Sequence, residues 1–63
     1  MPSITISGPR LEDLDKKRQL VEEITDAMEK AYPNPRRSFV ITINENPPEN
    51  VAIGGQLNID REK

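Results

Sequence analysis

One amphipathic segment of helical length lies between two short segments rich in β-branched residues, and this order restricts the fold more than any other feature of the sequence. Apolar residues recur at helical spacing along one face of this segment, whereas charged residues occupy the other face. The apolar stripe consists of Leu14, Leu20, Val21, Ile24, Ala27, Met28 and Ala31. We therefore predict a helix over about 13–32, with Asp13 as its N-cap residue.

The flanking segments have the pattern of strands. Residues 3–7 read Ser-Ile-Thr-Ile-Ser, which places Ile4 and Ile6 on one face, and Gly8-Pro9 ends this strand. A second strand is predicted over 38–44, where apolar residues run nearly without interruption, so we expect burial on both of its faces. Because a helix separates them, the two strands should be parallel and joined by a right-handed crossover.

The charged face of the predicted helix carries acidic residues placed four positions before basic ones. Asp13 precedes Lys17 and Asp26 precedes Lys30 at this spacing. Such i,i+4 pairs stabilise an isolated helix by a few tenths of a kcal/mol each. We expect these two ion pairs on the solvent side of the helix.

The last part of the chain is expected to form a small hairpin. The apolar residues of 51–57 flank Gly54-Gly55, a dipeptide suited to a tight turn, and 58–63 form a polar tail that frays unless it docks on a neighbour. The predicted fold class is therefore α+β, a βαβ unit with a short C-terminal hairpin. Residues 1–63 should form a single domain.

The chain is too short to be stable alone without a further source of stability. A domain of 63 residues buries only about 60% of the surface of its unfolded chain. The sequence has neither cysteine nor histidine, which excludes disulfides, zinc fingers, thiol chemistry and imidazole catalysis. Self-association is the remaining means of stabilisation, and we expect a homo-oligomer without a metal site.

The composition also excludes several classes of partner and location. The net charge is −2 and the only aromatic residues are Tyr32 and Phe39, so nucleic acid is not an expected partner. No apolar run approaches the roughly 20 residues of a membrane span. We expect no membrane association, and the absence of cysteine fits a cytoplasmic location.

The clearest candidate for a functional group is Pro2, which directly follows Met1. Methionine is generally removed when the next residue is small, and its removal would leave a free secondary amine at the start of the first strand. An amine in an apolar pocket has a lowered pKa and acts as a base near neutral pH. The alternative is that Pro2 only happens to follow the start codon.

Several motifs together resemble the 4-oxalocrotonate tautomerase family of the tautomerase superfamily, and the resemblance covers essentially the whole chain. They are Met1-Pro2, Gly8 and Arg10 in the first loop, Lys16-Lys17 near the helix start, Glu45 at the end of the second strand, and Ile53-Gly54-Gly55. The resemblance implies that the terminal proline is a general base that moves a proton between carbon and oxygen of a small enol or keto acid. It also implies hexamers built as trimers of βαβ dimers, active sites where subunits meet, and no metal or organic cofactor.

The resemblance assigns roles to individual residues. Pro2 matches the catalytic proline. Arg10 is the same residue type as the loop arginine of the family, but it lies two residues closer to the proline than in the best-known members. The second-strand arginine of the family falls on Val40, so we expect Arg37 to bind substrate in its place, with Arg36 as the other candidate. The family's aromatic residue near the glycine pair falls on Val51, which can form an apolar wall beside the proline.

Two functions remain open at this point. The first is keto–enol tautomerisation of a 2-hydroxy-dienoate or 2-keto acid, and related members of the superfamily suggest dehalogenation or decarboxylation by the same proline. The second is a non-catalytic oligomeric assembly or binding module of the same fold, which the missing second-strand arginine favours.

Overall fold

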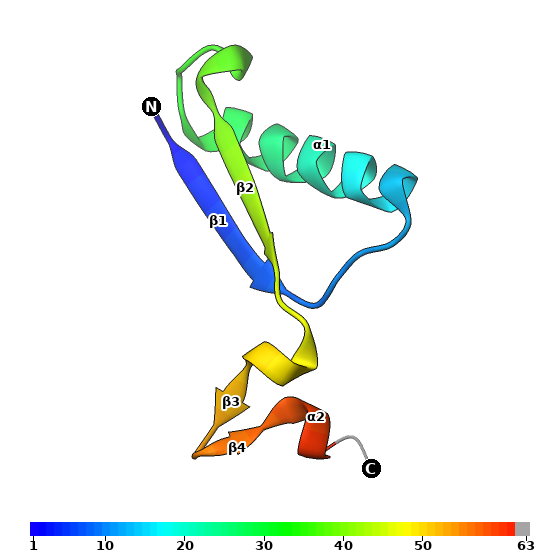
Figure 1. Ribbon diagram of the computed structural model, residues 1–63. Coiled ribbons are helices and arrows are strands. Elements are labelled where there is room, and N and C mark those ends of the chain that lie inside the picture. Colours follow the sequence, from blue (N-terminus) through cyan, green and yellow to red (C-terminus); the bar gives the residue numbers. More distant parts are fainter. Residues whose placement is uncertain (62–63) are drawn as a thin grey trace.

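The computed structural model describes residues 1–61, and Figure 1 shows how its elements are arranged. Strand β1 (Ser3–Gly8) is followed by helix α1 (Leu14–Ala31) and strand β2 (Val40–Glu45). Two short strands, β3 (Ala52–Ile53) and β4 (Gln56–Leu57), and the short helix α2 (Asn58–Arg61) follow. This order confirms the predicted α+β class. Residues 62–63, the end of the expected polar tail, lie outside the described residues.

The main sheet consists of β1 and β2, which run parallel as predicted. Ile4 is the partner of Ile41 and Ile6 is the partner of Ile43, and all four side chains are half-buried. Helix α1 covers one face of this sheet, and β3, β4 and α2 extend beyond the end at which both strands finish (Figure 1). Residues at one end of the β1–β2 sheet therefore have different neighbours from residues at its other end.

The structure corrects two expectations for the second strand. It begins at Val40 instead of residue 38, because Arg36–Ser38 forms a 3-10 turn, η1, that directly follows Pro35. Its side chains alternate between exposed and half-buried, so the predicted burial on both faces is wrong for the single chain. The reason is that only one helix covers the sheet, and the other face carries Val40, Thr42 and Asn44.

Helix α1 begins and ends where the sequence predicts. The Asp13 side chain accepts hydrogen bonds from the backbone N–H groups of Asp15 at 2.9 Å and Lys16 at 3.4 Å, which confirms it as the N-cap residue. At the other end, Tyr32 takes an extended conformation and donates its N–H to Met28. The proline at residue 33 disfavours a helical conformation at Tyr32 and so stops the helix there.

Removal of the Asp13 cap should weaken the fold in a measurable way. We expect Asp13→Ala to lower the free energy of unfolding by about 1 kcal/mol, because two N–H groups of the first turn lose their acceptor. Asp13→Ser is the matched control, since a serine hydroxyl keeps a capping acceptor. Denaturant unfolding at fixed protein concentration measures both, and equal losses in the two variants would contradict the capping role.

The apolar stripe of α1 is only partly covered. Leu20, Val21 and Ile24 are half-buried and Met28 is buried. Leu14, Ala27 and Ala31 of the same stripe are exposed in the single chain. A two-stranded sheet is too narrow to cover a stripe that runs the whole length of an 18-residue helix.

The two predicted ion pairs within the helix are replaced by pairs to other elements. Lys17 Nζ lies 2.7 Å from Glu45 at the end of β2, instead of pairing with Asp13. Asp26 binds Arg36 of η1 at 2.9 Å, instead of Lys30. Residues distant in sequence compete for these side chains, and helical spacing alone does not reveal that competition.

The C-terminal segment contains the predicted hairpin. Strands β3 and β4 are antiparallel and are joined by Gly54 and Gly55, whose φ angles are +60° and +85°. Two consecutive positive φ angles are typical of a type I′ turn and are readily adopted by glycine. This turn explains the paired glycines without any role in ligand binding.

The single chain leaves nearly all of its hydrophobic residues at least partly exposed to water. Among residues 1–61, Met28 is the only hydrophobic residue that is buried. The radius of gyration is 15.2 Å, whereas a compact chain of this length would have roughly 11 Å. Val40, Ile53, Leu57 and Ile59 lie exposed on the sheet and the C-terminal segment, so the chain by itself lacks a sufficient core.

None of the helices within residues 1–61 has the length and apolar character needed to cross a lipid bilayer.

Candidate active site

Pro2 is fixed at the start of the sheet, where β1 begins. Its carbonyl oxygen accepts a hydrogen bond from the backbone N–H of Val40 at 3.1 Å, which extends the β1–β2 ladder by one bond. The Pro2 residue is half-buried, whereas Met1 is 87% exposed. The position of the Pro2 ring is therefore set by the sheet, while Met1 stands open to solvent.

Arg37 lies at the same end of the sheet as Pro2. It belongs to the turn η1, which comes directly before β2, and it is exposed. Within residues 1–61 no ion pair involves Arg37. Its guanidinium is therefore accessible to solvent, and its predicted role in substrate binding stays a prediction.

The neighbouring Arg36 is already engaged with helix α1. It binds Asp26 at 2.9 Å and also Glu29, and these two carboxylates hold the pKa of Arg36 above its ordinary value, mainly through the hydrogen bond to Asp26. These contacts attach η1 to the helix. Of the two arginines considered from the sequence, Arg36 has ion-pair partners in the part of the chain that the structure describes, and Arg37 has none there.

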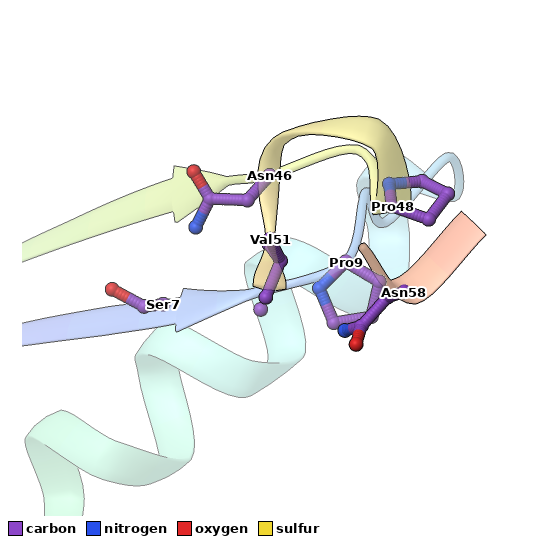
Figure 2. A pocket seen from close by; sticks show the side chains of 7 residues that line it. Ser7, Pro9, Asn46, Pro48, Val51 and Asn58 are labelled. Atoms are coloured by element: carbon purple, nitrogen blue, oxygen red, sulfur yellow. The ribbon is translucent and has the colours of Figure 1, made fainter. Parts of the chain in front are cut away.

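Arg10 and Val51 lie at the opposite end of the sheet. Arg10 is exposed in the loop that follows β1, and Val51 is half-buried beside a recess of about 360 Å³ (Figure 2). The recess is lined by Ser7, Gly8, Pro9, Asn46, Pro48, Val51 and Asn58. No lining residue is charged, and its polar groups are one hydroxyl and two amides.

The four candidate residues thus form two pairs that one chain does not bring together. Pro2 and Arg37 precede β1 and β2, whereas Arg10 and Val51 follow them. A strand advances by about 3.3 Å per residue, so the six residues of β1 separate Pro2 from Arg10 by roughly 20 Å. A small keto acid is too short to contact both pairs in one chain.

The recess contains polar residues that sequence reasoning missed. Ser7 ends the alternating pattern of β1, Asn46 follows β2, and Asn58 begins α2 and donates its N–H to the carbonyl oxygen of Val51 at 2.8 Å. Each of these residues is ordinary for a strand end or a turn. The available signal was the position of Ser7 and Asn46 at the carboxyl ends of the two parallel strands, where ligand sites often occur.

The contacts of Glu45 are a second feature that sequence reasoning missed, although the residue itself belongs to the motifs of the resemblance. Its Oε2 atom accepts a hydrogen bond from the backbone N–H of Leu11 at 2.8 Å and lies 2.7 Å from Lys17 Nζ. The hydrogen bond from Lys17 is the main cause that holds the pKa of Glu45 below its ordinary value, and the Leu11 bond and the nearby charge of Arg10 act in the same direction. Glu45 therefore joins β2, the loop after β1 and the first turn of α1.

The lowered pKa of Glu45 leads to a prediction about acid stability. A carboxylate with a depressed folded-state pKa adds stability that is complete above its unfolded pKa of about 4.3 and is lost as the pH falls through the folded value. We expect wild type to be more stable than Glu45→Gln by a constant margin at neutral pH. The margin should shrink in acid below that unfolded value.

Thermal midpoints measured across this pH range at fixed protein concentration test the prediction. Asp15→Asn is the matched control, because Asp15 pairs with Arg18 on the exposed side of the helix. The stability difference between wild type and Asp15→Asn should be small at every pH, since exposed ion pairs contribute little to stability. If the stability difference between wild type and Glu45→Gln does not depend on pH, the lowered pKa of Glu45 is contradicted.

Comparison with known proteins places the chain in a family. Residues 2–61 match the family model described as tautomerase enzyme. No match was found among curated protein sequences.

Solved structures of similar proteins share the fold over nearly the whole chain. DmpI from Archaeoglobus fulgidus is 41% identical, with 94% of this chain and 100% of that chain covered and a TM-score of 0.80. The 4-oxalocrotonate tautomerase isozymes from Methylibium petroleiphilum are 27% identical, with 98% and 100% covered and a TM-score of 0.81. DmpI from Helicobacter pylori is also 27% identical, with 94% and 98% covered and a TM-score of 0.78. The family match, the agreement of fold and the βαβ order with Pro2 at its start lead to one conclusion: the chain belongs to the tautomerase enzyme family.

Proposed function

We propose that this protein is an isomerase that catalyses keto–enol tautomerisation of a small 2-hydroxy-dienoate or 2-keto acid, with Pro2 as the general base after removal of Met1. The observation that carries the proposal is a family match over residues 2–61 that includes a proline directly before β1, held there by the hydrogen bond from the Val40 N–H to its carbonyl oxygen. Pro2 is half-buried and Arg37 lies at the same end of the sheet. Both features suit a base that acts on an anionic substrate.

The proposed chemistry needs one proton acceptor and one site for negative charge. The secondary amine of Pro2 takes the proton from the enol hydroxyl and returns it to the substrate carbon, so that no proton is gained or lost overall. Arginine side chains bind the substrate carboxylate and stabilise the charge that develops on the oxygen. The same positive charges disfavour protonation of the amine and so favour its basic form.

The site we propose is shared between subunits. Arg10 and Val51 of a neighbouring copy would complete the half-site formed by Pro2 and Arg37, because one chain separates these pairs by roughly 20 Å. The exposed apolar residues and the large radius of gyration support a homo-oligomer, with a hexamer built as a trimer of dimers as the expected form. Light scattering coupled to gel filtration measures the mass of the assembly.

The alternative function is a non-catalytic oligomeric assembly or binding module. One observation favours it: Val40 occupies the strand position at which the resemblance places an arginine, and Val40 is exposed. An aliphatic side chain cannot bind a carboxylate. In that case the protein would assemble but would not accelerate tautomerisation.

One experiment separates the two functions. Mass spectrometry first establishes that Met1 has been removed, and the processed protein is then assayed with the enol form of phenylpyruvate, a generic carboxylate-bearing enol. Turnover well above the buffer rate supports the isomerase. An assembled, processed protein that leaves the buffer rate unchanged would establish the non-catalytic alternative.

A further inference from the structure

We propose that Glu45 is a positioning residue that orients Arg10 for substrate binding, and that Lys17 keeps the charge of Arg10 available to the substrate. This inference rests on the proposed function, because it assigns a task to Arg10 in the tautomerase site. The carboxylate of Glu45 touches neither Pro2 nor the recess beside Val51. Its effect must therefore pass through the loop that carries Arg10.

The geometry begins with the position of Glu45 at the carboxyl end of the sheet. Glu45 is the last residue of β2 and is the partner of Gly8, the last residue of β1. The next ladder bond, from Asn46 N–H to the Gly8 carbonyl at 2.8 Å, holds this end of the sheet together. The side chain of Glu45 is 27% exposed, so it projects from a rigid part of the structure into a partly covered space.

The second step is the hydrogen bond from Leu11 to Glu45. The N–H of Leu11 and the carbonyl group of Arg10 belong to one planar peptide unit. When the Leu11 N–H is bound to Oε2 of Glu45 at 2.8 Å, the orientation of that plane is restricted. The direction in which the Arg10 side chain leaves the backbone is then restricted as well.

The third step concerns charge. A carboxylate close to Arg10 would by itself attract the guanidinium and compete with a substrate carboxylate. Lys17 Nζ, 2.7 Å from the same oxygen and 27% exposed, neutralises Glu45. Glu45 therefore fixes the backbone beside Arg10 while its own charge is already compensated, and Arg10 remains exposed.

This arrangement predicts a specific kinetic pattern. Glu45→Gln leaves a weaker, neutral acceptor for Leu11 and should raise KM for a carboxylate substrate by about tenfold, because a hydrogen bond between charged groups is lost or misaligned. The value of kcat should change much less than KM, since the proposal assigns Arg10 to binding the substrate carboxylate, whereas the proton transfer takes place at Pro2. Lys17→Met should also raise KM, because the uncompensated Glu45 then attracts Arg10.

The test compares the processed wild type with Glu45→Gln, Lys17→Met, Arg10→Ala and the double variant Arg10→Ala/Glu45→Gln. Each is assayed with the enol of phenylpyruvate and with the enol of its methyl ester, which lacks the negative charge. Asp15→Asn, on the exposed side of α1, is the matched control for loss of one carboxylate and should behave as wild type. Gel filtration confirms that each variant assembles.

We expect KM to rise for the acid and not for the ester in both single variants, and Glu45→Gln to have no further effect when Arg10 is alanine. An unchanged KM, an equal rise for acid and ester, or additive effects with Arg10→Ala would overturn the positioning role. If Glu45→Gln does not assemble, Lys17→Met tests the proposal by the same comparison of KM for the acid and for the ester. A processed wild type without turnover would instead refute the proposed function, and the role of Glu45 with it.

Discussion

A chain that retains any residue ahead of Pro2 should lose about 10²–10⁴-fold in kcat/KM, the usual contribution of a general base. A preceding residue acylates the proline nitrogen, and the resulting tertiary amide has no basic lone pair. The protein can be made with an N-terminal extension whose cleavage leaves Pro2 as the first residue. Activity with the enol of phenylpyruvate is then measured before and after cleavage.

The cleavage itself supplies the control, since the same preparation is compared in both forms. Met1 is 87% exposed, so an extension should be tolerated by the single chain, and gel filtration shows whether the assembly is retained. Pro2→Ala, which keeps a primary amine after processing, should show a smaller loss than the blocked form. Equal activity before and after cleavage would rule out Pro2 as the base.

Two impaired variants should regain activity when they are assembled together. Pro2→Ala lacks the secondary amine and Arg10→Ala lacks the loop arginine, and these residues flank the six-residue β1 at opposite ends. If each site takes Pro2 from one subunit and Arg10 from another, random mixing leaves both residues intact in about a quarter of the sites. Mixed samples should therefore recover roughly that share of wild-type activity.

The mixing experiment needs dissociation and reassembly, which each variant must also undergo alone. Neither variant should gain activity from that treatment. A mixed assembly, confirmed by mass, that is no more active than its two components would contradict the shared site. In that case both residues would have to act within one chain, despite the roughly 20 Å between them.

Local signals in the sequence were sufficient for most of the fold. The alternation around Ile4 and Ile6, the Asp13 cap and the Gly54-Gly55 turn each depend on residues a few positions apart, and the structure confirms all three. The start of β2 was missed because Arg36–Ser38 takes a 3-10 turn, in which Arg36 binds Asp26 and Glu29. Those contacts span the connection between helix and strand, and local patterns do not encode them.

The candidate site was less predictable, for two physical reasons. The ion pair between Lys17 and Glu45 joins residues far apart in sequence, whereas helical spacing pointed to Asp13 as the partner of Lys17. The separation of Pro2 from Arg10 follows from the direction of β1, and the proposed contact between copies would depend on exposed side chains such as Val40 and Ile53, whose partners a local pattern does not define. Candidate residues for the chemistry were therefore easier to identify from the sequence than their arrangement in space.

The protonation of the Pro2 nitrogen, followed by ¹⁵N NMR of the processed assembly, tests the central claim most directly. A general base must be deprotonated to act, so the ascending limb of the kcat/KM profile with pH should report its titration. We predict that the nitrogen loses its proton over the same pH interval in which kcat/KM rises. A nitrogen that stays protonated while kcat/KM rises to its plateau would contradict the assignment of Pro2 as the catalytic base.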